Sequence, residues 1–371
     1  MNSFPLADPI PLPAPVWLFK LLSLLTLGLH FAAVMMLVGS LILVIYLNAV
    51  GRSKKDLDRI HASYTLAKRL PVIMTYVVNL GVPPLLFVQV LYGRQIYSSS
   101  VLIGTSWISV IFLLMASYAA IYAAVGAIEK RKSAVGWAAL ALFLVMGIGQ
   151  IYSMNMTLML RPEAWREMYL SNPSGLPTKM ADPTMMPRWM FVMAGGPFFG
   201  GLWAALLSNM VYLRDGVREC LRKAGGMSAV IGAALMLLFG YRSLATQPDG
   251  IMQAIGQAPL YNLSMLVCAA TIVLAGLLGL IQAIGKKTTT LISTLALVVG
   301  FLSAATAGIV RDGVRDFTLK PKGFDVYGGP VYPNWSVLIA FFLLFVIMLG
   351  IIFWLLQVMR KATPPQEEIA L

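Results

Sequence analysis

His30 is the residue of this chain best suited to chemistry in an apolar setting. It lies in the stretch TLGLHFAAVMM, inside a long apolar run that contains no acidic residue. Neutral imidazole binds haem iron well, so one interpretation is an axial haem ligand. An imidazole in hydrocarbon is costly without a polar partner, so the alternative is a packing histidine hydrogen-bonded to another helix. The other histidine, His61, lies in RIHASYTLAKR, where we expect it to be solvated.

Glycine and proline gather in two further apolar stretches, NLGVPPLL (79–86) and MAGGPFFGG (193–201). Proline removes a helical hydrogen bond and kinks a helix. Small side chains allow either a neighbouring helix or a flat cofactor to come close. The sequence therefore leaves tight packing and a cofactor cradle as alternatives at both places.

Several classes of chemistry are excluded. Zinc, P-loop, Ser-His-Asp and dinucleotide-binding motifs are absent, so nothing points to hydrolysis or to nucleotide chemistry. The two cysteines, Cys220 and Cys268, are too few for a disulfide framework or a thiolate metal site.

The elements that must position these residues are long apolar runs. Hydrophobic residues make up 59% of the 371 residues and charged residues only 12%. Most runs exceed the roughly 20 residues that a helix needs to cross a bilayer, and in lipid such runs must be helical. We predict an all-α polytopic membrane bundle, a single transmembrane domain over 1–371. Its nine transmembrane helices are expected at about 17–48, 71–97, 102–127, 134–160, 188–213, 226–243, 260–284, 289–310 and 335–359.

The distribution of charge predicts the orientation of the bundle. None of the 15 acidic residues lies inside an apolar run, and 17 of the 28 Lys and Arg residues lie in alternate short connections. The positive-inside rule places these connections in the cytoplasm, with the N-terminus outside and the C-terminal PPQEEIAL inside. Clusters beside membrane spans also account for the net charge of +13, so we exclude nucleic-acid binding.

The connections on the other side are longer. Segments 161–187, 244–259 and 311–334 are rich in Pro, Gly, Trp and Tyr. They are either a docking surface for a partner or simple caps on the bundle. The first residues, MNSFPLADPIPLPAPVW, lack the basic region and cleavage site of a signal peptide, so we interpret them as an uncleaved lead into the first helix.

Four motifs follow one another along the chain. They are His30 with Phe31 after it, DPTMMPRWMFVMAGG at the fifth run, TQPDGIMQAI followed by YNLSMLV after the sixth, and GIVRDGVRDF after the eighth. In this order they resemble motifs of subunit I of the cytochrome bd quinol oxidases, over most of the chain. That family has nine helices and an outside N-terminus, as the charge pattern predicts here.

The resemblance implies a set of cofactor-binding residues. His30 resembles the first-helix histidine ligand of the family and is the predicted metal ligand. Met265 falls near a methionine haem ligand, Asp312 close to a carboxylate that ligates a haem, and Arg315 close to the neighbouring arginine. The cofactor implied is at most one haem b, with quinol as a further candidate.

The departures from the family decide the expected function. Phe191 stands where the family has the histidine of the low-spin haem, and Arg188 where it has a lysine. Gly250 and Ile255 replace the lysine and glutamate of the quinol element, and the long quinol loop that follows in the family is missing. Phenylalanine cannot ligate iron, so we expect the oxidase scaffold without its three-haem oxygen-reducing machinery.

The resulting expectation is a subunit of a respiratory electron-transfer complex in a bacterial inner membrane. Its predicted partners are a second membrane subunit and a periplasmic redox protein such as a c-type cytochrome. Whether the chain is itself an enzyme stays open. The alternatives are a haem-free structural membrane anchor on the same scaffold and a small-solute transporter that uses the two kinked helices.

Overall fold

The computed structural model describes residues 11–176, 182–210, 213–285 and 289–362. The first ten residues, the tail PPQEEIAL and the predicted cytoplasmic pair Lys286 and Lys287 lie outside these ranges. The helices are α1 (Val16–Ser53), α2 (Leu57–Ala67), α3 (Leu70–Leu91), α4 (Gly93–Leu102), α5 (Gly104–Glu129), α6 (Val135–Leu158), α7 (Pro162–Ser171), α8 (Met185–Met210), α9 (Asp215–Ala245), α10 (Ile251–Gln257), α11 (Pro259–Ile284), α12 (Thr290–Leu319), the short 3-10 helix η1 (Lys320–Lys322) and α13 (Trp335–Ala362).

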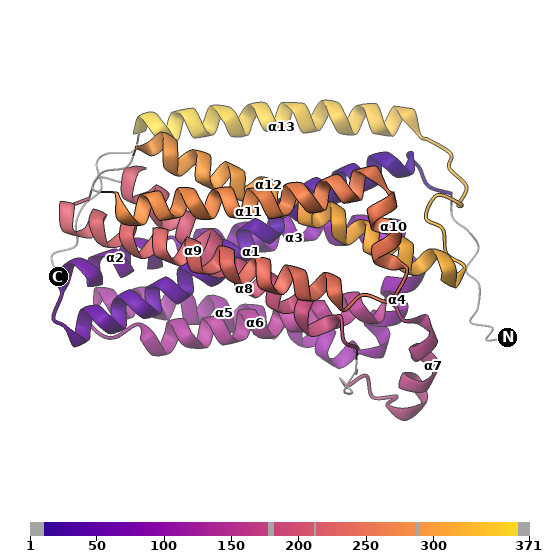
Figure 1. Ribbon diagram of the computed structural model, residues 1–371, viewed down its shortest axis with the longest axis horizontal. Helices are drawn as coiled ribbons and strands as arrows, with labels where there is room; N and C mark the ends of the chain where they lie inside the picture. The colour runs from indigo at the N-terminus through magenta and orange to yellow at the C-terminus, as the bar shows by residue number, and fades with distance from the viewer. Residues whose placement is uncertain (1–10, 177–181, 211–212, 286–288, 363–371) are drawn as a thin grey trace.

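The long helices run side by side in one bundle (Figure 1). Within the described ranges, eight helical segments are long and apolar enough to cross a membrane, which confirms an all-α polytopic bundle. The ninth expected span coincides with α13, whose apolar part is described over Trp335–Met348. This helix runs along the edge of the bundle, and its described side chains are almost all exposed (Figure 1).

Two helices extend well beyond the apolar runs that predicted them. The eighth run ends at residue 310, but α12 continues to Leu319 and carries Asp312 and Asp316 with it. The sixth run begins at residue 226, but α9 begins at Asp215. Apolarity marks where a helix meets hydrocarbon, whereas a helix ends where its backbone can turn, as at Gly323 with its φ of +84°. Asp312 and Asp316 therefore lie on a helix and not in the connection that follows the eighth run.

Three short helices fill connections that the sequence left unassigned, and a fourth, α4, includes the end of the second predicted run. The second run breaks at Tyr92, so that α3 gives way to α4, and α2, α7 and α10 lie at the ends of the bundle. His61 lies in α2 and is buried, contrary to the expectation of a solvated residue. The Ser63 hydroxyl of α2 accepts a hydrogen bond from the side-chain amide of Asn48 in α1 at 3.2 Å, which holds α2 against α1.

The centre of the bundle is packed through glycine. A Cβ atom on Gly39 of α1 would lie 2.8 Å from the Cα of Gly200 in α8 and would overlap the carbonyl oxygen of Gly196. A Cβ atom on Gly201 would lie 2.5 Å from the backbone nitrogen of Ala229 in α9. Backbones touch at these crossings, as small residues permit in membrane bundles. The structure thus supports tight packing, rather than a cofactor cradle, for the glycines around Pro197.

The two proline-containing helices are continuous. Pro83 and Pro84 lie inside α3, and Pro197 lies inside α8. The carbonyl of Pro197 accepts a hydrogen bond from the Ser228 hydroxyl of α9 at 2.8 Å. Neither helix is therefore interrupted at its prolines.

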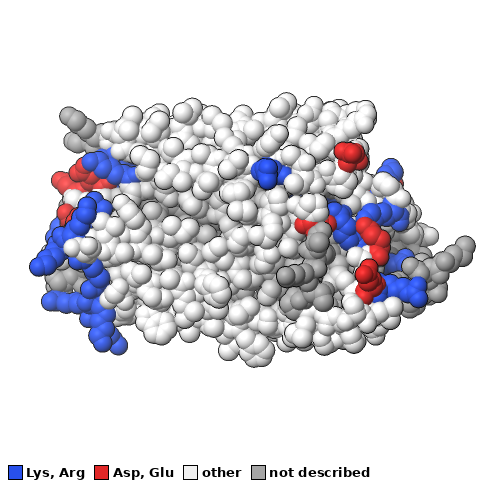
Figure 2. Space-filling model, turned by 60° about the horizontal axis from the view of Figure 1, so that its bottom comes forward, with Lys and Arg blue, Asp and Glu red and all other residues white. Residues whose placement is uncertain are grey.

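Charge separates along the long axis of the bundle. Figure 2 shows Lys and Arg concentrated at one end, both signs mixed at the other, and a broad, nearly uncharged band between them. The first end holds the connections of residues 52–69, 130–132 and 213–223, and the second holds α7, α10 and the segment after α12. The uncharged band is the surface expected to face lipid.

Candidate functional site

His30 lies between α1 and α3. Its Nδ1 atom is 3.0 Å from the carbonyl oxygen of Val77. Because a carbonyl oxygen only accepts, Nδ1 carries the proton and Nε2 keeps its lone pair. A histidine that ligates a metal commonly uses this tautomer, with the other nitrogen donating to a carbonyl. The same bond also satisfies a packing histidine, so the geometry alone fits both interpretations.

Glycine makes the room that this imidazole occupies. A Cβ atom on Gly81 would lie 2.8 Å from Cε1 and 3.1 Å from Nδ1 of His30. The glycine of NLGVPPLL therefore lets the α3 backbone lie against the edge of the ring. This pairing of His30 with Gly81 connects two sequence features that looked independent.

Asp312 and Arg315 lie together near the mixed-charge end of the bundle, in a buried ionic cluster. One Asp312 oxygen accepts from Lys20 Nζ of α1 at 2.7 Å, and the other lies 3.8 Å from Arg315 Nη1. Lys20 also pairs with Asp316, whose other oxygen accepts from the Tyr92 hydroxyl at 2.5 Å. The side chains of Lys20 and Asp312 are each only 7% exposed.

Aromatic rings complete the cluster. The Arg315 guanidinium lies 4.6 Å from the centre of the Tyr92 ring, and Lys20 Nζ lies 5.4 Å from that of Tyr327. Such cation–π contacts stabilise charge that has been taken out of water. Each of the four oxygens of the two carboxylates thus has a partner within 4 Å.

The structure does not bring His30 and Asp312 together. Lys20, which holds Asp312, precedes His30 by ten residues on α1, which is a rise of about 15 Å. The side chains of a helix also lean towards its N-terminus, which is away from His30 in the case of Lys20. Two ligands of one metal ion each lie at about 2 Å from it, so these residues do not form a single ligand set.

Met265 lies on α11, half-buried. One turn after it, the Cys268 thiol donates to the carbonyl of Ser303 in α12 at 3.5 Å. One turn before it, the Tyr261 ring packs against Gly313, where an added Cβ atom would lie 2.8 Å away. Met265 therefore lies beside α12, between the turn that carries Asp312 and the middle of that helix.

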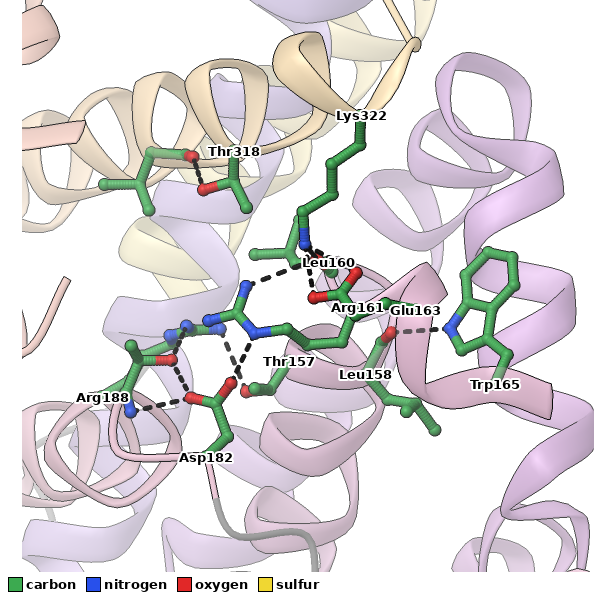
Figure 3. A network of polar contacts seen from close by, with 12 residues as sticks. Thr157, Leu158, Leu160, Arg161, Glu163, Trp165, Asp182, Arg188, Thr318 and Lys322 are labelled. Carbon is green, nitrogen blue, oxygen red and sulfur yellow. Dashed lines mark hydrogen bonds and ion pairs between the residues drawn. The ribbon is translucent and has the colours of Figure 1, made fainter. Parts of the chain in front are cut away.

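A second polar network ties α7 to the start of α8 (Figure 3). Asp182 accepts from Arg161 Nε at 2.7 Å, from the Thr184 hydroxyl at 2.5 Å and from the Thr184 amide at 2.8 Å. Arg188 donates to the hydroxyls of Thr184 at 3.0 Å and Thr157 at 3.2 Å. Arg188, at the family's lysine position, is thus held by neutral hydroxyl groups beside a second guanidinium.

Asp182 is expected to make the fold sensitive to acid. Burial acts to raise its pKa, but the bonds from Thr184 and Arg161 outweigh burial and hold the pKa below its usual value. A lowered folded pKa means that the stabilisation is complete above the unfolded pKa of about 3.9 and is lost as pH falls through the folded pKa. Asp182→Asn should therefore lower the unfolding temperature in mild detergent at pH 7, and this deficit should shrink below pH 4.

The exposed Asp249 provides the control for this prediction. Asp249→Asn makes the same chemical change without a network, so its unfolding temperature should follow that of the wild type at every pH. A deficit for Asp182→Asn that is constant from pH 7 to pH 3 would contradict the assignment.

The positions where the sequence departs from the family are filled by packing. The Phe191 ring lies against α9, 3.3 Å from where a Cβ atom on Gly240 would be. Ile255 is fully buried and forms a small apolar cluster with Ile251 and Val314, which anchors α10 on α12. Gly250, with a φ of +89°, makes the turn into α10. An apolar anchor and a turn thus stand at the positions where the resemblance places the lysine and glutamate of the quinol element.

These residues fit a haem only in part. His30 offers one free imidazole nitrogen, whereas both oxygens of Asp312 are already engaged. In the residues that the structure describes, His, Cys, Asp and Glu form no group of three or more that could hold a metal ion. His30 can thus offer one axial ligand, and Asp312 does not fit as a second.

Sequence reasoning missed Lys20, Tyr92 and Asp316. The signal available for Lys20 was a lone cation inside the first apolar run. For Asp316 it was the i, i+4 spacing from Asp312, which places both carboxylates on one face if the helix continues. Nothing in the sequence indicated that Tyr92 would reach them.

A comparison with solved structures identifies the fold. The structure of bd oxidase from Geobacillus thermodenitrificans matches 96% of this chain and 100% of the matched chain, with a TM-score of 0.67. Sequence identity is 14%, so the likeness is one of fold. The sequence matches no protein-family model and no curated protein. The chain is a multi-pass membrane protein with a bd-oxidase-like fold.

Proposed function

From the premise of a bd-oxidase-like fold, we propose that this chain is an integral membrane subunit of a respiratory electron-transfer complex that does not itself reduce oxygen. The observation that carries the proposal is the packing of Phe191 against Gly240. This contact fills, with an apolar ring, the position at which the related oxidases have a haem-ligating histidine. The replacement of the quinol pair by the buried Ile255 and the turn at Gly250 agrees with it.

In this proposal one haem b, where present, is bound at His30. The residue would supply its Nε2 atom, because Nδ1 is committed to Val77. A haem there would supply one-electron transfer, and the chain would orient its ligand through the Val77 carbonyl and exclude water through the close packing of α1 and α3. Asp312 would not complete that site, because both of its oxygens are engaged.

The proposed partners follow from two surfaces. The helix α13 presents exposed apolar side chains along its length, such as Trp335 at 59% and Trp354 at 60%, and we assign it to the second membrane subunit. The end formed by α7, α10 and the segment after α12 carries both signs of charge and would be the periplasmic face, where a c-type cytochrome docks. In this orientation the Lys- and Arg-rich end faces the cytoplasm of a bacterial inner membrane.

A haem-free structural anchor is the second candidate, and one observation favours it. The Lys20 ammonium forms an ion pair with the Asp312 carboxylate, which the family resemblance suggested as a haem ligand. A lysine that neutralises a former ligand is expected where the cofactor has been lost and the fold kept.

An absorption spectrum separates the two candidates. We expect the purified chain to show a Soret band that His30→Ala abolishes while the protein stays monodisperse. His61→Ala removes the other imidazole and should leave the band unchanged. In an oxygen electrode the isolated chain should consume no oxygen with a reduced quinol. A wild type without a Soret band supports the anchor, and sustained quinol-dependent oxygen uptake would overturn the proposal.

A further inference from the structure

A crevice of about 520 Å³ lies at the Lys- and Arg-rich end of the bundle, remote from the sites above. It lies where α1 ends, α2 and α9 begin, and α11 ends. Its polar lining includes Asp56, Asp58, Arg59, Glu219 and Lys223, with Cys220 beside them.

The apolar side of the crevice opens towards the lipid-facing surface. Met227 on α9 and Ile284 on α11 are 48% and 72% exposed. The two helices cross closely there, since a Cβ atom on Gly226 would lie 2.5 Å from the carbonyl oxygen of Gly279. Beyond the crossing, exposed apolar side chains continue along the two helices at Ile231 and Leu277. These side chains offer an apolar surface on which an acyl chain can lie.

The polar side of the crevice is richer in carboxylates than the rest of this end of the bundle. Three carboxylates face two cations, although Lys and Arg dominate this end of the bundle. Asp56 pairs with Arg59 at 2.9 Å and Glu219 with Lys223 at 2.5 Å. Among the described residues, Asp58 has no ion-pair partner, and its carboxylate lies against Gly216 in the first turn of α9.

We propose that this crevice binds the headgroup of a phospholipid that carries a primary ammonium group, as phosphatidylethanolamine does. The ammonium hydrogen-bonds Asp58, the phosphate pairs with Lys223 and Arg59, and the acyl chains lie along the exposed apolar faces of α9 and α11. The Glu219–Lys223 pair is more than half exposed, so exchanging it for a phosphate costs little. A trimethylated ammonium has no N–H to donate, and a purely anionic headgroup brings no cation to Asp58.

Lipid-dependent protection of Cys220 tests the proposal. The purified full chain, with Cys268→Ser to leave one thiol, is delipidated and returned to mixed micelles with phosphatidylethanolamine, phosphatidylcholine or phosphatidylglycerol of the same acyl chains. N-ethylmaleimide labelling of Cys220, which lines the crevice, is then timed. We expect phosphatidylethanolamine to slow labelling about tenfold relative to the other two lipids, the ratio expected for one charge-assisted hydrogen bond.

Two variants locate the effect. Asp58→Asn should reduce the tenfold difference to less than about twofold, whereas Asp249→Asn, at the opposite end of the bundle, should preserve it. Equal protection by all three lipids in the wild-type background, or equal selectivity in Asp58→Asn, overturns the proposal. If Asp58→Asn does not fold, the comparison of lipids on the unsubstituted crevice still decides, because it needs no substitution there. The result does not depend on haem or on oxygen uptake.

Discussion

Gly39→Ala is expected to prevent this bundle from folding to a stable, monodisperse protein. The added methyl group would overlap the carbonyl oxygen of Gly196 and lie 2.8 Å from the Cα atom of Gly200. Both contacts are backbone atoms inside a helix, so no rotamer change can relieve them. Overpacking of a core costs about 1–3 kcal/mol where side chains can adjust, and we expect more than about 3 kcal/mol here because α1 and α8 must separate.

Gly147→Ala is the matched control for this prediction. It makes the same change in α6, where an added Cβ atom meets nothing within 4 Å. Alanine is favoured over glycine in a helix by about 1 kcal/mol, so this variant should be as stable as the wild type or more stable. Yield and elution profile in mild detergent, followed by the unfolding temperature, compare the two. Equal behaviour of both variants would show that α1 and α8 do not cross at Gly39.

The class of fold was predictable because hydrocarbon penalises a charged or polar side chain at any position of a membrane span. The run predicted at 102–127 corresponds to α5, Gly104–Glu129. A charged side chain within such a span would be costly in hydrocarbon, and the absence of charged residues can be read directly from the sequence. The extension of α12 to Leu319 was not predictable in this way. Asp312 and Asp316 tolerate burial because Lys20, nearly 300 residues earlier, neutralises them, and pairing between such distant residues leaves no mark on local hydropathy.

The candidate site was predictable only as single residues. His30 stood out by its chemistry and Gly81 by its type, but their contact depends on how α1 crosses α3. The resemblance to the bd oxidases supplied Asp312 and Arg315 as neighbours, and the structure places them 3.8 Å apart. The resemblance did not predict that Asp312 and Arg315 lie apart from His30. Their position depends on the pairing of Asp312 with Lys20, which is specific to this chain.

Lys20→Met is expected to destabilise the bundle by about 3–5 kcal/mol, the usual cost of removing one partner from a buried ion pair. It leaves two buried carboxylates with Arg315 as the nearest cation. Asp312→Asn should cost less, because Lys20 keeps its pair with Asp316. The double variant should be more stable than the sum of the two losses implies, since removing both charges leaves less unpaired charge. Reversible unfolding in mixed micelles measures all three.

The exposed pair of Lys320 and Asp325, 3.4 Å apart at the same end of the bundle, provides the reference for this comparison of single and double variants. Lys320→Met and Asp325→Asn should show a coupling of less than about 1 kcal/mol, as surface pairs do. A coupling at Lys20 and Asp312 as small as this would mean that the carboxylate is not committed to the lysine. Asp312 would then be free to bind a metal, and an Asp312→Asn variant with an altered absorption spectrum would establish that it does. A large coupling with an unaltered spectrum would instead show that Lys20 has taken the place of a cofactor at this end of the bundle.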